Sequence, residues 1–440
     1  MTAPLDAIIL ADGPHSHAKV AGLSLRERAK RVAGRVGATR VLVVDGSDRA
    51  QIASWWDAGP KARLLVIRAG DQVVHTPLVA GLGAASGDAI AVAPPDPASD
   101  DVAPGAYAGA FVVSSDAGRV IEKLARGESD TEIAAGIAEK AAKIEHGPIA
   151  RHPVRDAREK KAAAKLLYRI VHKPQDNAIT RYLYRPVSFP LTKLFLRTPI
   201  TPNQISYLVG AMVAIGVYLT ASGSMNRVIA GTALCLAASY VDCCDGEVAR
   251  LKLLSSKLGA WLDTIIDELS SVTYMAALGY HCHLYFGRMY FGDLGFDPWL
   301  ASTAIGVVTY LLTIYCVYYN IIVVVGSANS QDYVGKFEVV PGDEPNTVRL
   351  RPAATKAIAT EDLPPVIRFV ATYIPYIVRR DFIAWGTLVL AIAHLTQVSF
   401  GIQVLGGFVT SVIVSIDHVR LVRQRRAITR AGQTLIRRAS

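Results

Sequence analysis

Hydrophobic and polar positions divide the chain into two unlike parts. Before about residue 145, short apolar runs alternate with amphipathic stretches, a pattern typical of an α/β domain. After residue 200 come six longer apolar stretches, which lie near residues 204–222, 227–247, 258–281, 299–326, 381–398 and 401–419. Each approaches the roughly 20 residues that a helix needs to cross a bilayer. The pattern therefore predicts an N-terminal α/β soluble domain followed by an α-helical integral membrane bundle of six transmembrane helices.

The soluble part contains several runs that predict strands. They lie at Asp6–Gly13, where the strand enters a turn, and at Arg40–Val44, Arg63–Arg68 and Asp88–Ala93, while Leu23–Val36 has helical periodicity. A ligand of such a sheet binds beyond the carboxyl ends of its strands, which here means close to Asp12 and Gly13.

The second and third long apolar stretches carry four carboxylates. Asp242 and Asp245 are three residues apart and Asp263 and Asp267 are four apart, so each pair lies on one face of its helix. Carboxylates at membrane depth are energetically costly and are usually functional. Two such faces opposed across a helical hairpin form a cage of oxygen ligands that suits Mg²⁺, Mn²⁺ or Ca²⁺.

Glycines and an arginine accompany these acids. Gly246 and Gly259 allow the two helices, or a ligand, to come close to the backbone. Arg250 follows near the end of the helix, where its guanidinium can bind a phosphate. The combination indicates a diphosphate bound through metal ions, with one carboxylate free to accept a proton from an attacking hydroxyl. The structural alternative is a network in which Arg250 and Lys252 neutralise buried acids.

This segment resembles the signature of the CDP-alcohol phosphotransferase family, D-x-x-D-G-x-x-A-R-x8-G-x-x-x-D-x-x-x-D. Every fixed position is filled, by Asp242, Asp245, Gly246, Ala249, Arg250, Gly259, Asp263 and Asp267. The resemblance implies an enzyme in which the hydroxyl of one alcohol displaces CMP from a CDP-alcohol. It implies a two-metal site of Mg²⁺ or Mn²⁺ held by Asp242, Asp245 and Asp263, with Asp267 as a further ligand and the general base. CDP would contact Asp242, Gly246, Ala249, Arg250 and Gly259.

Two segments upstream of the first span have open interpretations. Thr201-Pro202-Asn203 fits a helix N-cap, and it also resembles a recurrent nucleotide-side feature of the family, which makes Thr201 and Asn203 candidate CDP contacts. The stretch Arg181–Arg197 mixes aromatic, leucine and basic residues, which predicts a helix lying in the membrane interface. Arg181 and Arg185 either bind lipid head groups there or hold the phosphate of an acceptor.

The formal net charge is +10, but its placement argues against a nucleic-acid partner. Basic residues gather beside the predicted spans, as at Arg420–Arg426 and Arg437–Arg438. The positive-inside rule then places both termini and the acidic site of this multi-pass protein at the cytoplasmic face of an inner or plasma membrane, with membrane lipid as a partner. Residues 1–25 lack the pattern of a secretory signal, and the cysteines show no spacing typical of zinc or disulfide frameworks.

The N-terminal part resembles a sugar-nucleotidyltransferase domain, as fused to phosphotransferase domains in bifunctional CTP:inositol-1-phosphate cytidylyltransferase/di-myo-inositol-phosphate-phosphate synthases. The family's glycine-rich loop, G-x-G-x-R, is altered here, because Pro14 follows Gly13 and removes a backbone donor. A degenerate, inactive domain is therefore expected. The predicted domains are residues 1–145 (nucleotidyltransferase-like), 146–178 (a basic connector with a helix at Arg151–Arg169), 179–425 (phosphotransferase) and 426–440 (a basic tail).

The substrates stay open at this stage. The fusion favours an inositol-phosphate-type substrate, whereas CDP-diacylglycerol would make the protein a phospholipid synthase. A cation transporter that uses the acidic cluster is an alternative of another class. The resemblance also implies a homodimer.

Overall fold

The computed structural model describes residues 4–46, 49–60, 63–95, 102–171, 178–287, 289, 292, 294–325, 333–342, 344, 346–353, 364 and 380–436. The chain forms two compact units. The first unit comprises Met1–Asp176 together with Thr192–Ile200 and Glu247–Leu254, and the second comprises Asn177–Leu191, Thr201–Gly246 and Ser255–Ser440. Each unit is described by itself.

A six-stranded mixed sheet forms the centre of the first unit, in the order β4-β1-β5-β8-β7-β9. Strand β1 pairs in parallel with β4 and β5, whereas β8 is antiparallel to both β5 and β7. The strands are β1 (Leu5–Leu10), β4 (Ala38–Val44), β5 (Arg63–Arg68), β7 (Ala89–Val92), β8 (Tyr107–Val113) and β9 (Ala142–Glu145). The strands predicted within residues 6–13, 40–44, 63–68 and 88–93 are confirmed.

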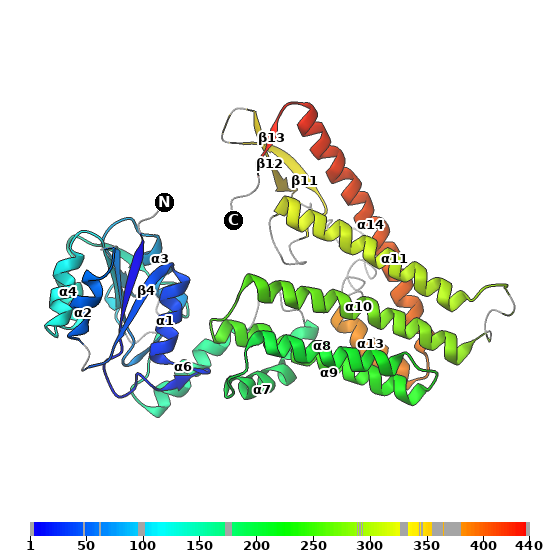
Figure 1. Ribbon diagram of the computed structural model, residues 1–440, viewed down its shortest axis with the longest axis horizontal. Coiled ribbons are helices and arrows are strands. Elements are labelled where there is room, and N and C mark those ends of the chain that lie inside the picture. Colours follow the sequence, from blue (N-terminus) through cyan, green and yellow to red (C-terminus); the bar gives the residue numbers. More distant parts are fainter. Residues whose placement is uncertain are drawn as a thin grey trace. The chain divides into compact units, whose positions relative to one another are not determined.

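Helices cover both faces of this sheet (Figure 1). On one face, Ala7 and Ile9 of β1 pack in a core with α1 (Leu25–Arg35) and α3 (Thr76–Ala84). On the other, Ile8 and Leu10 pack with side chains from α2 (Gln51–Asp57), α4 (Ala117–Ala125) and α5 (Asp130–Ile137). Successive residues of a strand point to opposite faces of the sheet. Because helices cover both faces of β1, its residues Ala7–Leu10 are all apolar.

The structure differs from the sequence prediction at two helix starts. The helix predicted from Leu23 begins at Leu25, because Leu23–Ser24 pairs with Lys19–Val20 as strands β3 and β2 and Ser24 accepts a hydrogen bond from the backbone N–H of Glu27. The helix predicted from Arg151 begins at Ala157 as α6 (Ala157–Tyr168). Residues Arg151–Pro153 instead form β10, antiparallel to β6 (Gln72–Val74).

Helices of the second unit occupy all six predicted apolar stretches. They are α8 (Pro202–Thr220), α9 (Met225–Leu251), α10 (Lys257–Phe286), α11 (Pro298–Tyr319, continued by the π-helical turn η4, Asn320–Val325), α13 (Arg380–Ile392) and α14 (Thr396–Arg430). Within the described residues, four meet the length and apolarity of a membrane span: α8, α9, α11 with η4, and α14. The apolar part of α13, Phe382–Ile392, is shorter, and α10 carries three acidic residues in its first half.

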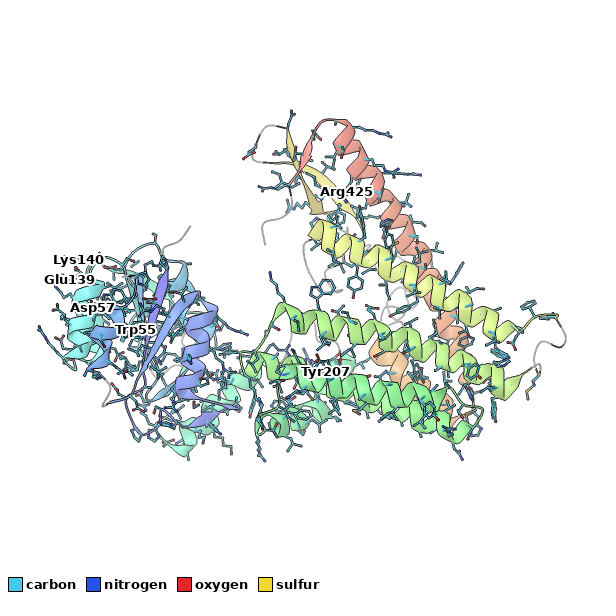
Figure 2. All side chains as sticks on the ribbon, in the orientation of Figure 1. Trp55, Asp57, Glu139, Lys140, Tyr207 and Arg425 are labelled. Atoms are coloured by element: carbon cyan, nitrogen blue, oxygen red, sulfur yellow. The ribbon has the colours of Figure 1, made fainter. Side chains whose placement is uncertain are left out.

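Apolar side chains cover much of the outside of these helices. Tyr207 on α8, labelled in Figure 2, is 62% exposed, and Leu405 on α14 is 65% exposed. Many exposed apolar side chains on long helices fit a lipid environment. The structure therefore describes a membrane protein with at least four candidate spans.

The predicted interfacial segment is helical. It consists of the π-helical turn η3 (Thr180–Tyr184) and α7 (Arg185–Leu196). Between η4 and α13, β11 (Phe337–Pro341) and β12 (Thr347–Pro352) pair antiparallel, and β12 also pairs with β13 (Thr434–Leu435) from the basic tail. The tail is therefore partly structured, because α14 continues to Arg430 before this strand.

Candidate functional site

Three of the four predicted carboxylates converge in the second unit. Asp242 and Asp245 on α9 and Asp263 on α10 each offer one oxygen, and these oxygens all lie within 4.8 Å of one another. Asp242 and Asp245 reach Asp263 because the side of α9 that carries them faces the side of α10 that carries Asp263, and their three-residue spacing places both on one side of α9. The structure therefore brings together Asp242 and Asp245, which lie one turn apart on α9, and Asp263 from α10.

A serine that the sequence analysis did not identify fixes one of these carboxylates. The hydroxyl of Ser206 donates a hydrogen bond to Oδ2 of Asp245 at 2.6 Å. Both side chains are buried, with 4% of Ser206 and 7% of Asp245 exposed. Ser206 lies one turn after Pro202 on α8, so the segment Thr201–Ser206 delivers a hydroxyl to the cluster. The only sequence signal was a polar residue inside the first apolar stretch.

The donor set fits a hard divalent cation. All three ligands are carboxylates, the preferred ligands of Mg²⁺ and Mn²⁺. Carboxylates within 4.8 Å of one another repel when ionised, and a bound cation relieves that repulsion. The neighbouring thiol of Cys244 is buried and directed at the backbone oxygens of Ser188 and Tyr240, at 3.4 and 3.5 Å. The cluster is thus an oxygen site, not a thiolate site.

Asp267 lies one turn beyond Asp263 on α10 and is not a member of this group of three. Its roles as a fourth ligand and as the general base stay predictions. The adjacent Glu268 is a carboxylate that the sequence analysis passed over. It accepts hydrogen bonds from the hydroxyls of Tyr310 at 2.8 Å and Tyr318 at 3.0 Å. Two phenol donors stabilise this acid within the bundle.

The start of α8 lies beside the start of α10. A Cβ added at Gly259 would lie 3.1 Å from Oδ1 of Asn203, so the glycine leaves room for that amide. Thr201 is the N-cap of α8 and forms a reciprocal capping box with Gln204. The capping explanation of Thr201 is therefore confirmed, while contact of Thr201 and Asn203 with a nucleotide stays a prediction.

The last turn of α9 and the residues after it belong to the first unit. There, Arg250 donates to the backbone oxygen of Val171 at 3.4 Å. The ammonium of Lys252 donates to the backbone oxygens of Thr198 and Ile200, at 2.8 and 2.9 Å. Burial, with the charge of Arg31, lowers the pKa of Lys252. Because these bonds of Lys252 go to carbonyls, the alternative in which it neutralises the acids loses support.

The two candidate acceptor contacts differ in exposure. Arg185, the first residue of α7, is buried, whereas Arg181 on η3 is exposed. Their role toward an acceptor phosphate stays a prediction.

In the first unit, the turn after β1 is closed by contacts within the protein. Asp12 forms an ion pair with Arg49. A Cβ added at Gly70 would overlap the backbone oxygen of Asp12, so the two chain segments are tightly apposed. His17 lies 3.5 Å from Asp45. The turn at Asp12 and Gly13 is thus occupied by an internal ion pair.

Comparison with known proteins bears on the membrane part. Residues 199–342 match the CDP-alcohol phosphatidyltransferase family. The chain is similar to proteins named bifunctional IPC transferase and DIPP synthase from Rubrobacter xylanophilus, with 35% identity over 23% of this chain and 23% of that protein, and from Aquifex aeolicus, with 30% identity over 30% and 28%. It is also similar to the archaetidylinositol phosphate synthase of Pyrococcus horikoshii, with 38% identity over 18% of this chain and 42% of that protein. The similarity thus spans less than half the length of these curated relatives.

Proposed function

We propose that this chain, whose residues 199–342 form a CDP-alcohol phosphatidyltransferase domain, transfers a phosphoalcohol group from a CDP-alcohol to the hydroxyl of an acceptor alcohol, with release of CMP. The observation that carries the proposal is the convergence of Asp242, Asp245 and Asp263 within an apolar bundle. Three carboxylates at such a place are costly unless a cation and a reaction need them.

The carboxylates have distinct roles in this proposal. Asp242, Asp245 and Asp263, with Asp267 beside them, hold two divalent metal ions, Mg²⁺ or Mn²⁺. When bound, such ions neutralise the charge of the donor diphosphate and of the departing CMP. Ser206 holds the carboxylate of Asp245 in its orientation. Asp267 accepts the proton of the acceptor hydroxyl, whose oxygen forms a bond to the phosphorus of the donor alcohol as the bond to CMP breaks.

The CDP group lies against the parts of α8, α9 and α10 that carry little side-chain bulk. Gly259 leaves open the space beside Asn203, and Arg250 supplies the positive charge that a phosphate needs. The proposed CDP contacts are Thr201, Asn203, Asp242, Gly246, Ala249, Arg250 and Gly259.

An inositol-phosphate-type substrate is the first candidate. The relative from Aquifex aeolicus supports it through its name, which refers to IPC and DIPP, and the relative from Pyrococcus horikoshii is named for archaetidylinositol phosphate. Arg181 and Arg185 are the proposed acceptor contacts, because guanidinium groups bind phosphate well. CDP-diacylglycerol is the second candidate, favoured by the exposed apolar side chains of the bundle, such as Leu405.

The membrane arrangement is part of the proposal. The helices at all six apolar stretches support six spans, with both termini and the site at the cytoplasmic face and η3–α7 in the interface. Residues 1–145 serve as an inactive nucleotidyltransferase-like module, 146–178 as the connector, 179–425 as the phosphotransferase domain and 426–440 as the tail. A homodimer in the membrane is proposed from the family resemblance.

The test is CMP release by the purified full-length protein with Mg²⁺ or Mn²⁺. CDP-inositol and CDP-diacylglycerol are compared, each with and without inositol phosphate, and the Asp242→Asn/Asp245→Asn variant is the matched control. Metal-dependent release from one donor, absent in the control variant, supports the proposal and identifies the donor. Metal-dependent cation uptake into vesicles without CMP release from any CDP-alcohol would replace it by the transporter alternative.

A further inference from the structure

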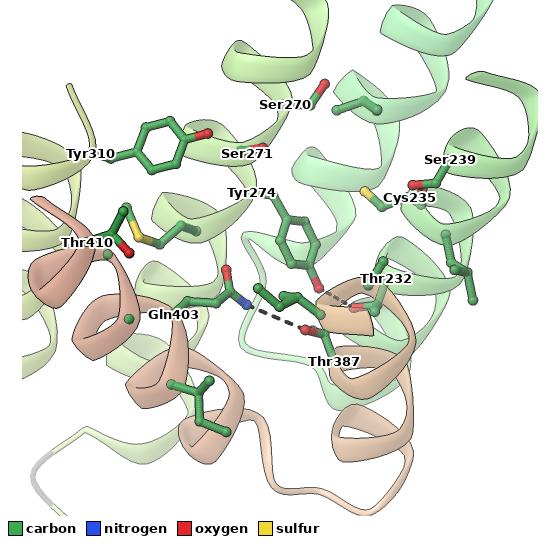
Figure 3. A pocket seen from close by; sticks show the side chains of 18 of the residues that line it. Thr232, Cys235, Ser239, Ser270, Ser271, Tyr274, Tyr310, Thr387, Gln403 and Thr410 are labelled. Carbon is green, nitrogen blue, oxygen red and sulfur yellow. Dashed lines mark hydrogen bonds between the residues drawn. The ribbon is translucent and has the colours of Figure 1, made fainter. Parts of the chain in front are cut away.

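A cavity of about 390 Å³ lies inside the second unit (Figure 3). It is bordered by residues of α8, α9, α10, α11, α13 and α14. Its volume falls within the range of about 300–1,000 Å³ that is usual for small-molecule sites. Its polar lining includes Ser239, Ser270, Ser271, Tyr274, Thr313 and Gln403.

The cavity continues the helix faces that carry the carboxylates. Ser239 precedes Asp242 by three residues on α9, and Ser271 follows Asp267 by four residues on α10. Residues at these spacings lie one turn apart on the same side of a helix. The lining therefore begins one turn from Asp242 on α9 and one turn beyond Asp267 on α10, on the side away from the connection between the two helices.

Four of the lining hydroxyls donate their hydrogens within their own helices. Ser239 donates to the backbone oxygen of Cys235 at 3.1 Å, Ser271 to that of Asp267 at 3.0 Å, and Thr313 to that of Thr309 at 2.9 Å. Ser270 does the same toward Ile266. A hydroxyl has one hydrogen and two lone pairs, so these groups offer a ligand only acceptors.

Gln403 adds a further acceptor. Its amide nitrogen donates to the hydroxyl oxygen of Thr387 at 3.5 Å (Figure 3) and to that of Ser399 at 3.3 Å, which leaves its carbonyl oxygen for a ligand. Opposite, the hydroxyls of Tyr274 and Thr232 are bonded to each other at 2.8 Å. The cavity thus combines apolar walls with several oxygen acceptors.

Charge decides which ligands fit these acceptors. None of the described residues that line the cavity is charged. A phosphate, which is anionic and lacks donors, would find no partner there and would lose its hydration. A neutral molecule with several hydroxyl groups donates to the acceptors and places its C–H faces against the apolar walls.

We propose that this cavity holds the neutral, hydroxyl-bearing part of one substrate, a polyol, while the diphosphate stays at the carboxylates. The inference rests on the proposed function, because it deepens the substrate assignment of the same site. A polyol placed here lies beside Ser271, one helical turn from Asp267 on α10. The polyol belongs either to the CDP-alcohol donor or to the acceptor, and the experiment separates the two.

The test fills the cavity from a position with room for it. A Cβ added at Gly407, which lines the cavity, would meet no atom within 4 Å, so Gly407→Met extends into open space. Gly401→Met is the matched control, because Gly401 lies on the same helix, is equally open at Cβ and lines a different cavity. We expect Gly407→Met to raise the KM of one alcohol substrate about tenfold or more. The Kd of CDP, measured by calorimetry, and all constants of Gly401→Met stay within about twofold.

A second variant tests the same cavity in case Gly407→Met does not fold. Ser271→Ala removes an acceptor without adding bulk, and we expect a KM increase of about threefold to tenfold for the same substrate. Thr273→Ala is its control, because the Thr273 hydroxyl on the same helix bonds back to Leu269 and does not line the cavity. A rise in donor KM alone assigns the polyol to the CDP-alcohol, and a rise in acceptor KM alone assigns it to the acceptor.

Direct binding separates this inference from the proposed function. Equilibrium dialysis with radiolabelled myo-inositol should show binding to the wild-type protein that Gly407→Met abolishes, even if no CDP-alcohol yields CMP. Unchanged KM values in both cavity variants of an active enzyme would overturn the polyol site and leave the transferase intact. Absence of both CMP release and myo-inositol binding would overturn both.

Discussion

The hydrogen bond from Ser206 to Asp245 gives the sharpest test of the carboxylate cluster. Its oxygen–oxygen distance is 2.6 Å, and it joins two buried side chains of which one is an acid. Ser206→Ala removes the hydroxyl group and with it this hydrogen bond to the carboxylate of Asp245. Helix α8 keeps its backbone hydrogen bonds, because among the described residues the serine hydroxyl otherwise bonds only to the backbone oxygen of Pro202, at 3.3 Å.

The size of the effect follows from the charge of the acceptor. Hydrogen bonds to charged groups contribute about 1.5–3 kcal/mol, which corresponds to about 10-fold to 150-fold in an equilibrium constant. Loss of a group that orients a metal ligand usually weakens metal binding by about 10-fold to 100-fold. The two ranges agree, so we expect the Mg²⁺ or Mn²⁺ concentration for half-maximal CMP release to rise by one to two orders of magnitude.

The assay is a metal titration of CMP release at saturating substrates, with kcat read at saturating metal. The kcat of Ser206→Ala should recover to within a few-fold of the wild type once metal saturates, because the serine positions a ligand and does not touch the reacting atoms. Thr273→Ala, which removes a hydroxyl from α10, should leave the titration unchanged. An unaltered metal dependence in Ser206→Ala, alongside its loss in Asp245→Asn, would refute the positioning role.

Three further predictions follow from other residues. Asp267→Asn should abolish turnover while the Kd of the CDP-alcohol stays within a few-fold, as measured by calorimetry; normal activity would rule out Asp267 as the base. Gly259→Ala would place a Cβ 3.1 Å from Oδ1 of Asn203 and should raise the KM of the CDP-alcohol about threefold to tenfold, whereas Gly401→Ala should not. Burial, together with the charges of Arg28 and Arg35, lowers the pKa of His75 to about 4, below its unfolded value near 6.5. The stability it contributes is present above pH 6.5 and is lost as pH falls toward 4, by up to about 3 kcal/mol. After division by the intrinsic exchange rate at each pH, the protection of peptides from β5 to α3 should therefore fall more between pH 7 and pH 4.5 in the wild type than in His75→Gln; equal changes would contradict the assignment.

Local periodicity was enough to predict much of the fold. The strand at Arg63–Arg68 and the helices at all six apolar stretches could be predicted because both depend on the spacing of apolar residues along one element. Strand β10 could not, since Arg151–Pro153 is polar and becomes a strand only by pairing with β6. The helical composition lies in the Lys- and Ala-rich residues of α6 that follow, whereas Pro153 does not continue a helix and the partner strand decides the conformation of Arg151–Pro153.

For the carboxylate site, too, local spacing could be predicted from the sequence, whereas the contacts between helices could not. Spacings of three and four residues, together with the motif from Asp242 to Asp267, were sufficient to place each acid on a helix face and to name the reaction class. The sequence does not state which face meets which, so only the tertiary structure shows that Asp242, Asp245 and Asp263 converge and that Asp267 stands outside that group.

Contacts between residues far apart in the chain were decided by packing alone. Ser206 reaches Asp245 across 39 residues, and Tyr310 and Tyr318 reach Glu268 across 42 and 50. The cavity beside them also exists only because several helices enclose it. The sequence by itself determined which residues are candidates for the chemistry, because their spacing is local information. The tertiary structure decided which groups orient them, because periodicity describes one side of a helix and carries no record of the helix that packs against it.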